Sequence, residues 1–510
     1  MRTSIAACLG PHRGRWIALG LSVLLLTPAQ ARAPLPLLRP WVHPGAAFIR
    51  ANGYHGASTC AACHAQALSE VLESVHWTLA SPVRNVVGLP EGSWWGMANR
   101  QCALAGCMAA ANWLAATHGR FTPQSQGCGV CHIGALSAPP LPGRPPTAAQ
   151  RQTVDCLVCH AKHYDWSRRA RRVRDASGVH WGEDTSVRSA LSITRVPTNA
   201  ACLRCHEHAF SADYKRGTPF TVANDVHARA GLRCVTCHLT EHHKIAKGQV
   251  ESDMVANDRP DVPVRCSGCH GPSPHTGARA AILNAHIRRL ACQTCHIPQV
   301  SGIVYENWGE PVRDDAHGRH SALSKYDPSP ALRAAFVPTV RIERGPPQYE
   351  WRVANTAEQP AAQSWMAFAT STRDTPGARL YPVRALTQVM LFDRTRKMWQ
   401  APGMSGLRRD PQSAEFPLLL TPNREVYNRT GSVQQALAAG MRALGVPWSG
   451  QWRAMQVPGI SYISVNHGIR TRGLACIACH SRHGVMDFKR LGYSAQQIRQ
   501  LEQAVRPSAR

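Results

Sequence analysis

The sequence has few aromatic side chains, few lysines and no long apolar run. Aromatic residues make up 6% of the 510 residues, although hydrophobic residues reach 44%. A protein core of this size normally contains more large apolar side chains, so we expect a bound group to fill part of the interior. The longest apolar run, 16–26, has 11 residues. It is too short for a transmembrane helix, which argues against a polytopic membrane protein.

Cysteine is abundant, by contrast, and most of it falls in one repeated pattern. Cys-x-x-Cys-His attaches haem c: the two thiols add to the porphyrin and the adjacent His ligates the iron. Zinc sites and disulfides need no His directly after the second Cys, so neither explains the repeat. We therefore predict eight covalently bound haem c groups. The motifs, numbered in chain order, are Cys60/Cys63/His64, Cys128/Cys131/His132, Cys156/Cys159/His160, Cys202/Cys205/His206, Cys234/Cys237/His238, Cys266/Cys269/His270, Cys292/Cys295/His296 and Cys476/Cys479/His480.

The first 31 residues have the pattern of a cleavable signal peptide. Arg2, Arg13 and Arg15 form a positive n-region, 16–26 is the h-region, and 27–31 ends in an A-x-A cleavage pattern. The alternative is an uncleaved membrane anchor. Cleavage predicts a periplasmic protein without a stable membrane span, and haem attachment also takes place outside the cytoplasm.

The charge balance is strongly basic. Lys and Arg number 58 against 31 Asp and Glu, which gives a formal net charge of +27, and only seven of the basic residues are Lys. Arginine can neutralise haem propionates, and a positive surface also attracts small anionic substrates. Nucleic acid would suit the charge as well, but no other feature supports such a partner, and we expect none.

The motif spacing predicts the organisation of the chain. Motifs two to seven begin 26 to 46 residues apart, too few residues to wrap each haem separately. We expect a mainly α fold with much irregular structure, a multihaem cytochrome c fold around eight closely packed haems. The expected segments, all in one compact unit, are a signal peptide (1–31), a seven-haem region (32–297), a haem-free wrapping segment with minor β structure (298–475), and the eighth haem with a C-terminal helix (476–510).

Three secondary-structure elements can be placed in the later part of the chain. A helix is predicted over Val433–Leu444 with Ser432 as its N-cap. A second helix follows the capping box of Ser494 and Gln497. Alternation around Val340 predicts a short strand.

The histidines outside the motifs are candidates for the sixth ligand of each iron. Sixteen remain after the motif histidines and His12 are set aside, enough for all eight irons, so the count alone reveals no catalytic site. His243 is an alternative to one candidate, His242, and His55 is an alternative to another, His43. The predicted distal ligands are His43, His76, His227, His242, His275, His286 and His467.

Segments beside the motifs carry a family resemblance. They are 74–77 (SVHW), 131–134 (CHIG), 154–160 (VDCLVCH), 225–227 (DVH), 271–275 (GPSPH), 291–298 (ACQTCHIP), 435–441 (QALAAGM) and 479–482 (CHSR). Together they resemble the octahaem tetrathionate reductase family of multihaem cytochromes, over nearly the whole mature chain.

The resemblance implies that the second haem is catalytic and the other seven are bis-histidine. His132 would be its proximal ligand and Lys215 its distal ligand. A Lys amine binds iron only when neutral, which requires burial. On composition alone, Lys162, Lys244 and Lys247 compete with Lys215.

The resemblance also places an Asp and a free Cys near this iron. Asp213 matches the Asp, although it stands two residues before Lys215 and the family usually has three. Cys102 matches the Cys, but Cys107 lies five residues further on. A Cys102–Cys107 disulfide is therefore an alternative to a catalytic thiol.

The leading hypothesis is a reductase of small sulfur or nitrogen oxyanions, which takes tetrathionate to thiosulfate and also accepts nitrite or hydroxylamine. A periplasmic or membrane-bound redox partner would supply electrons to the bis-histidine haems. The alternatives are a non-catalytic electron carrier and an octahaem hydroxylamine oxidoreductase. Nitrite reductases with a Cys-x-x-Cys-Lys motif are disfavoured because all eight motifs end in His.

Overall fold

The computed structural model places most of the chain after the N-terminal 40 residues. It describes residues 41–82, 86–87, 92, 94–96, 132–134, 145–165, 168, 172–175, 178–181, 184–206, 218, 220–247, 256–313, 336–353, 357–358, 371–398, 416–444, 446–456 and 461–504. Within these ranges, no helix combines the length and the apolar character needed to cross a bilayer. The predicted signal peptide lies outside them.

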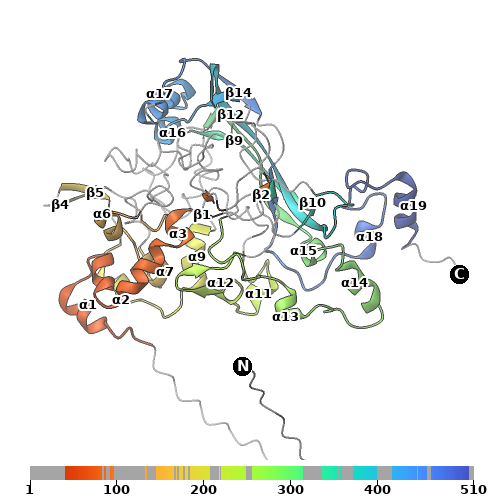
Figure 1. Cartoon of the computed structure of the whole chain (residues 1–510), viewed down its shortest axis with the longest axis horizontal. Helices are drawn as coiled ribbons and strands as arrows, with labels where there is room; N and C mark the ends of the chain where they lie inside the picture. Colours follow the sequence, from red (N-terminus) through yellow and green to blue (C-terminus); the bar gives the residue numbers. More distant parts are fainter. Residues whose placement is uncertain are drawn as a thin grey trace, which may run out of the picture. The chain divides into compact units, whose positions relative to one another are not determined.

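Short helices carry the cysteine motifs (Figure 1). Cysteines three positions apart lie one turn apart on the same side of a helix, so both thiols can reach one porphyrin. In the first motif the helix is interrupted at His64, which has a φ of −124° and a ψ of 41°. The helices at described motifs are α2 (Ala57–Leu72), α7 (Leu157–His160), α9 (Asn199–His206), α12 (Cys234–Cys237), α13 (Ser267–His270), α15 (Cys292–His296) and α18 (Cys476–Cys479).

Other short helices lie between the motifs, and three of them carry predicted distal ligands. These three are α3 (Val75–Thr78), α11 (Val226–Arg229) and α14 (Ala280–His286). The others are α1 (Ala46–Asn52), α6 (Ala148–Gln152) and α8 (Val187–Ala190).

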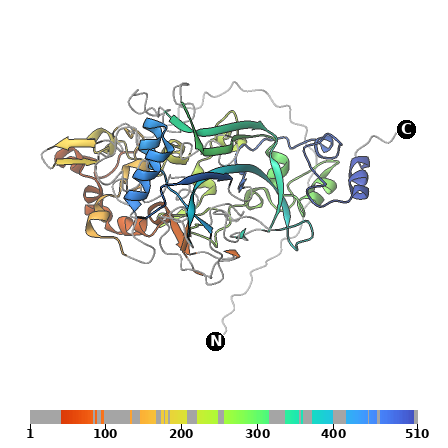
Figure 2. The ribbon, with the colours of Figure 1, turned by 90° about the horizontal axis from the view of Figure 1, so that it is seen from above.

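A seven-stranded sheet occupies the haem-free segment, and its long strands cross the middle of the molecule seen from above (Figure 2). The order is β10 (Gln348–Arg352), β12 (Arg379–Met398), β8 (Val300–Arg313) and β9 (Phe336–Gly345). β8 runs parallel to β12, and the other pairings are antiparallel. Three further strands pair with β12, namely β13 (Phe416–Leu419), β14 (Trp452–Gln456) and β15 (Ser461–Ser464).

Four two-stranded sheets complete the described strands. They are β1 (Ala80–Pro82) with β3 (Trp94–Gly96), β2 (Val86–Val87) with β11 (Ala357–Glu358), β4 (Arg172–Asp175) with β5 (Gly178–Trp181), and β6 (Thr240–Glu241) with β7 (Lys244–Ile245).

The strand content exceeds the minor β structure that we expected. The short strand predicted around Val340 is part of the ten-residue β9. β12 has 20 residues and pairs along its length with five strands. Met390, Leu391 and Phe392 are consecutive and all buried, because a central strand covered on both faces loses the apolar–polar alternation that identifies an exposed strand.

The sheet holds the segments of the seventh and eighth motifs. The carbonyl of Leu380 accepts hydrogen bonds from the N–H of Ala291 at 2.9 Å and from the hydroxyl of Thr294 at 2.6 Å. The N–H of Val465 donates to the carbonyl of Pro382 at 3.2 Å. Strand β12 thus fixes both α15 and the segment that carries His467.

Both predicted helices are confirmed. α17 spans Val433–Leu444, and the Ser432 hydroxyl accepts the N–H of Gln435 at 3.3 Å. α17 packs beside α16 (Arg424–Thr430) at one end of the sheet (Figure 1). α19 (Ala495–Gln503) begins with the capping box of Ser494 and Gln497. A Cβ at Gly440 would lie 2.0 Å from the carbonyl oxygen of Thr421, so glycine permits this close packing.

The Asp393 carboxylate fixes the end of β12. It accepts the N–H groups of Thr395 and Arg396, both at 2.9 Å, and of Ser449 at 2.6 Å. Burial raises the pKa of Asp393, but these hydrogen bonds outweigh burial and lower the pKa to about 2.

Asp393→Asn should lower the free energy of unfolding by about 1–3 kcal/mol at pH 7, because hydrogen bonds to a charged acceptor are lost. The folded pKa lies below the unfolded value of about 3.9, so this stabilisation is complete above that value and is lost as the pH falls toward 2. Urea unfolding followed by circular dichroism should therefore give curves that converge in acid. Asp374→Asn, at a side chain 80% exposed, is the control. An equal difference at pH 7 and pH 2 would contradict the prediction.

Candidate haem-binding and catalytic site

Seven motif histidines each face a second histidine ring. Metal–imidazole nitrogen bonds are about 2.0 Å long, so two rings on opposite sides of one iron should be roughly 6 Å apart. The seven arrangements therefore fit a bis-histidine haem. The ring-centroid distances are 6.0 Å for His43–His64 and His76–His206, 6.1 Å for His227–His270 and His286–His480, 6.2 Å for His275–His296, 6.3 Å for His160–His243, and 6.4 Å for His238–His467.

The observed pairs include six of the seven predicted distal histidines. The exception is His242, because the structure places His243 opposite His160. The His242 side chain is 64% exposed. His55, the alternative candidate to His43, has a different partner: its Nε2 lies 2.8 Å from the carbonyl oxygen of Asn52.

His242 and His243 are the two central residues of the β6–β7 hairpin, and both have positive φ values, 47° and 59°. A two-residue hairpin favours positive φ at both positions, which Asn and Gly adopt most easily. Holding a histidine in this backbone conformation lowers the stability of the fold by on the order of 1–3 kcal/mol for each residue. The turn directs the ring of His243 toward His160. No sequence pattern indicates which of the two adjacent histidines is the ligand.

Hydrogen bonds at Nδ1 orient several of these rings. When Nδ1 is bound to an oxygen, Nε2 is left to point at the opposite ring, which fixes both the tautomer and the orientation of a ligand. The Nδ1–oxygen distances are 2.9 Å for His238 to Ala246 O, 2.9 Å for His296 to Arg470 O, 3.0 Å for His480 to Leu501 O, 2.8 Å for His286 to Ile282 O and 3.0 Å for His275 to Asn284 Oδ1.

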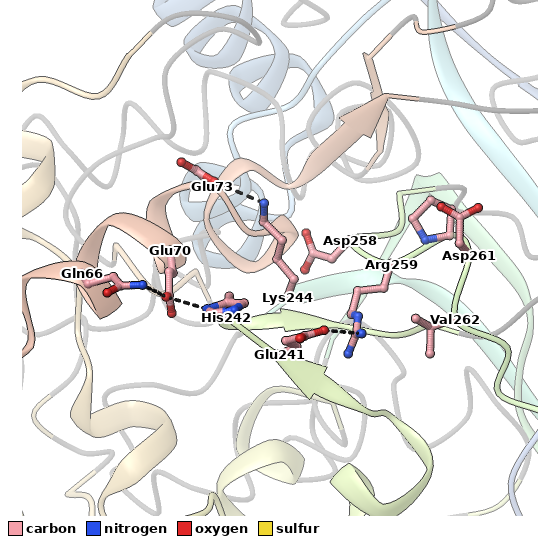
Figure 3. Close-up of a pocket in the computed structure, with 11 residues that line it drawn as sticks. Gln66, Glu70, Glu73, Glu241, His242, Lys244, Asp258, Arg259, Asp261 and Val262 are labelled. Carbon is pink, nitrogen blue, oxygen red and sulfur yellow. Dashed lines mark hydrogen bonds and ion pairs between the residues drawn. The ribbon is translucent and has the colours of Figure 1, made fainter. Parts of the chain in front are cut away.

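The Glu70 carboxylate contacts both histidines of the hairpin. Oε1 lies 2.8 Å from His242 Nδ1, and Oε2 lies 2.9 Å from His243 Nδ1. These bonds, that of His243 first, lower the pKa of Glu70. Figure 3 shows Glu70 between Gln66 and His242 at the edge of a pocket of about 510 Å³. The pocket is lined by Gln66, Glu70, Glu73, Glu241, His242, Lys244, Asp258, Arg259, Pro260, Asp261 and Val262.

Asp225 ties together the segments of two other distal ligands. Oδ1 accepts the N–H of His227 at 2.8 Å, while Oδ2 accepts those of Gly468 at 2.8 Å and Ile469 at 2.9 Å. Burial raises the pKa of Asp225, but these backbone donors outweigh burial and leave the pKa below its ordinary value. The segment after His467 is thereby fixed to helix α11.

The motif thiols define an order of neighbouring motifs. The first cysteines of motifs one and three, four and five, and six and seven have neighbouring side chains, at Cys60–Cys156, Cys202–Cys234 and Cys266–Cys292. Three further pairs interact electrostatically, at Cys159–Cys202, Cys237–Cys269 and Cys295–Cys476. The motifs therefore form a row in the order one, three, four, five, six, seven, eight.

Cys63 and Cys205 are the second cysteines of motifs one and four. Cys63 is exposed on α2, whereas Cys205 is half-buried on α9 and interacts electrostatically with Cys202 of its own motif. The structure gives both as thiols, in no disulfide bond, like the other motif cysteines in the described ranges. A thioether bond requires a thiol that is not oxidised to a disulfide. The attachment of haem through Cys63 and Cys205, as through the other motif cysteines, stays a prediction from the motif.

The second motif lies beside this row, next to Trp77. His132 Nε2 donates to the Trp77 carbonyl at 2.7 Å, and the two rings are 5.1 Å apart. Trp77 is fully buried, and a Cβ at Gly134 would lie 2.1 Å from its ring. Trp77 directly follows His76, which faces His206 of the fourth motif. The second and fourth motifs are thus in contact through two adjacent residues.

The remaining residues predicted for the catalytic centre lie outside the described ranges. They are Cys102, Cys107, Cys128, Cys131, Asp213 and Lys215, and their roles stay predictions. One competitor of Lys215 has another partner, since Lys244 Nζ lies 3.2 Å from Glu73 at the pocket of Figure 3.

Two family models match parts of the chain. "Cytochrome c bacterial" matches residues 348–483, and "Cytochrome c554 and c-prime" matches 155–239, which contains motifs three to five. The octaheme cytochrome c from Shewanella oneidensis has a similar solved structure. The match has a TM-score of 0.61 and 20% sequence identity, and covers 90% of this chain and 98% of that chain.

These matches support a multihaem c-type cytochrome. This cytochrome also matches an uncharacterized protein of Archaeoglobus fulgidus, with 25% identity over 234 residues, 39% of this chain and 78% of the relative. The matches support covalently bound haem c and a role in electron transfer or redox catalysis.

Asp225→Asn should lower the free energy of unfolding of the cytochrome by about 1–3 kcal/mol, because charge-assisted hydrogen bonds are weakened. It should also change the low-temperature EPR signals of the haems predicted at motifs five and six, because Asp225 holds the segments of their predicted distal ligands. The other five bis-histidine signals provide an internal reference. Changes spread equally over all of them would contradict the assignment.

Glu70→Gln should raise the reduction potential of the third haem by on the order of tens of mV. A carboxylate at Nδ1 makes the ligand more electron-rich and stabilises ferric iron, whereas an amide does so less. Spectroelectrochemical titration measures the shift. Glu73→Gln, one turn further along and 69% exposed, is the matched control. Equal titration curves for both variants would show that Glu70 does not act on this haem.

Proposed function

We propose that this cytochrome is an octahaem reductase of small sulfur and nitrogen oxyanions, with tetrathionate as its main substrate and nitrite and hydroxylamine as others. The pairing of seven distal histidines with motifs one and three to eight supports the proposal. It matches the pattern that the family resemblance implies, in which the second haem alone takes a different ligand. A periplasmic location, with electrons from a redox partner, fits this assignment.

The catalytic centre would be built around His132 and Lys215. The bound haem supplies one-electron transfers, and two of these cleave the central S–S bond of tetrathionate to give two thiosulfates. His132 would be the proximal ligand of this haem. In the structure its Nε2 donates to the Trp77 carbonyl, a hydrogen bond that ligation through Nε2 would replace. As a ligand, the Lys215 amine would be neutral. Released from the haem, it would take up a proton, and the resulting cation would attract the anionic substrate.

Two further residues have assigned roles at this centre. Asp213 delivers protons, which nitrite reduction consumes and tetrathionate reduction does not. A free Cys102 thiolate would attack a central sulfur of tetrathionate, breaking the central S–S bond and releasing one thiosulfate. Two electrons would then cleave the new bond to Cys102 and release the second thiosulfate.

Lys215→Met should alter the spectrum of one haem and lower tetrathionate-dependent oxidation of reduced methyl viologen by about 10²-fold, because a positive group at the reacting anion is removed. Low-temperature EPR of the oxidised protein, with and without nitrite, reports the ligand change. Lys162→Met, whose backbone N–H is bound to the Ser192 carbonyl, is the matched control. Seven bis-histidine signals and one signal that responds to nitrite are expected in the unmodified protein.

Eight bis-histidine signals without any response to nitrite, together with no turnover, would contradict the reductase. The cytochrome would then be an electron carrier in which every iron has two histidine ligands.

A further inference from the structure

Tyr349 on β10 is a fully buried tyrosine whose hydroxyl makes no hydrogen bond within the polypeptide. The residue is 2% exposed, and its Oη is buried without a partner. It belongs to a core cluster of apolar side chains, among them Leu380, Met486 and Leu491. A buried hydroxyl without a hydrogen bond lowers the stability of a fold, and phenylalanine would fill the same space without that loss. The hydroxyl therefore points to an acceptor outside the chain.

Other polar groups beside this hydroxyl are satisfied. Trp351, two residues further along β10 and on the same face of the sheet, is 4% exposed. Its Nε1 donates to the carbonyl of Leu491 at 3.0 Å. The carbonyl of Tyr349 itself accepts a hydrogen bond from the Arg490 guanidinium at 2.6 Å. Of these groups, only the Tyr349 hydroxyl is left without a partner.

The Tyr349 hydroxyl lies near the thiols of two neighbouring motifs. Cys479, the second cysteine of motif eight, packs against the same cluster. Burial raises the pKa of Tyr349, and the thiols of Cys479 and of Cys295, the second cysteine of motif seven, add to this shift. β10 lies beside α15 and α18, the helices of these two motifs (Figure 1). Haems attached at motifs seven and eight would therefore adjoin the hydroxyl.

The chemistry of haem c limits what the acceptor can be. The pyrrole nitrogens bind the iron, and thioether sulfur is a weak acceptor. The two propionates are carboxylates, which form strong hydrogen bonds with O–H donors. A tyrosine in apolar surroundings keeps its proton and acts as such a donor. The buried hydroxyl thus fits a haem propionate.

We propose that the Tyr349 hydroxyl binds a propionate of the haem at motif seven or motif eight and thereby raises the reduction potential of that haem. A propionate charge favours ferric iron, and a hydrogen bond to the carboxylate offsets part of this effect. Tyr349 is a positioning residue, because it acts on the iron through the carboxylate. The proposal requires covalently bound haem and no oxyanion, so it is independent of the proposed function.

The test compares the haem-loaded protein with its Tyr349→Phe variant, which loses the hydroxyl and keeps the ring. Redox titration followed by low-temperature EPR should show one midpoint potential shifted in the negative direction. At a fixed potential, the ratio of ferrous to ferric iron at that haem should fall several-fold. The midpoints of the other motifs should stay unchanged. His275→Met and His286→Met each remove one bis-histidine signal, and they identify the signals of motifs seven and eight.

Tyr427→Phe is the matched control. Tyr427 is also fully buried, but its hydroxyl donates to the carbonyl of Trp308 at 3.1 Å, within the haem-free segment. This variant should unfold at a lower urea concentration and leave the potentials of motifs seven and eight unchanged. Tyr349→Phe should also unfold at a lower urea concentration, because a hydrogen bond to a carboxylate is lost.

Unchanged potentials in Tyr349→Phe would overturn the proposal, since water would then be the acceptor or the hydroxyl would have none. A higher urea midpoint for this variant would do the same, because it marks a hydroxyl without a partner. Equal shifts of potential in both variants would show that the hydroxyl near the thiols has no special role. Tetrathionate turnover is not measured here, so a failed reductase leaves the Tyr349 assignment standing, and unchanged potentials leave the proposed function standing.

Discussion

The separation of two imidazole rings across one iron is the constraint on which the rest of the structure depends. Seven motif histidines face a partner ring at 6.0 to 6.4 Å. Most partners come from the segment of another motif: His76 follows motif one and faces motif four, and His243 follows motif five and faces motif three. Because each such pair cross-links two stretches of chain, short helices with little core of their own are held in place.

The sheet and the carboxylates position the ligand segments, which cross-linking alone does not do. A ligand also needs an orientation, and oxygens at Nδ1 provide it for many of the rings. β12 anchors helix α15 and the segment before motif eight by hydrogen bonds at Leu380 and Pro382. Asp225 then joins that segment to α11. The haem-free segment thus holds in place predicted ligands that are distant from one another in the sequence.

The sequence predicted the chemistry better than the architecture. The cysteine motifs are local patterns, and so are the caps of α17 and α19, where Ser432 and Ser494 act within one turn. The choice of His243 over His242 depends on the twist of a two-residue hairpin, which adjacent identical residues cannot encode. The sequence did not predict the seven-stranded sheet, because the buried strand β12 lacks the alternation of apolar and polar residues. The order of the motifs required contacts between thiols far apart in the chain, such as Cys60 and Cys156.

The pairing of His238 with His467 has a consequence for assembly. Chains are synthesised from the N-terminus, so motif five is made long before its partner histidine, which lies shortly before motif eight. A haem held at motif five would gain its second histidine only after the sheet has formed and its last strand has placed His467. Loss of the C-terminal part of the chain would remove that histidine again. A protease that trims the C-terminal part would thereby turn an internal relay into a site that binds external ligands.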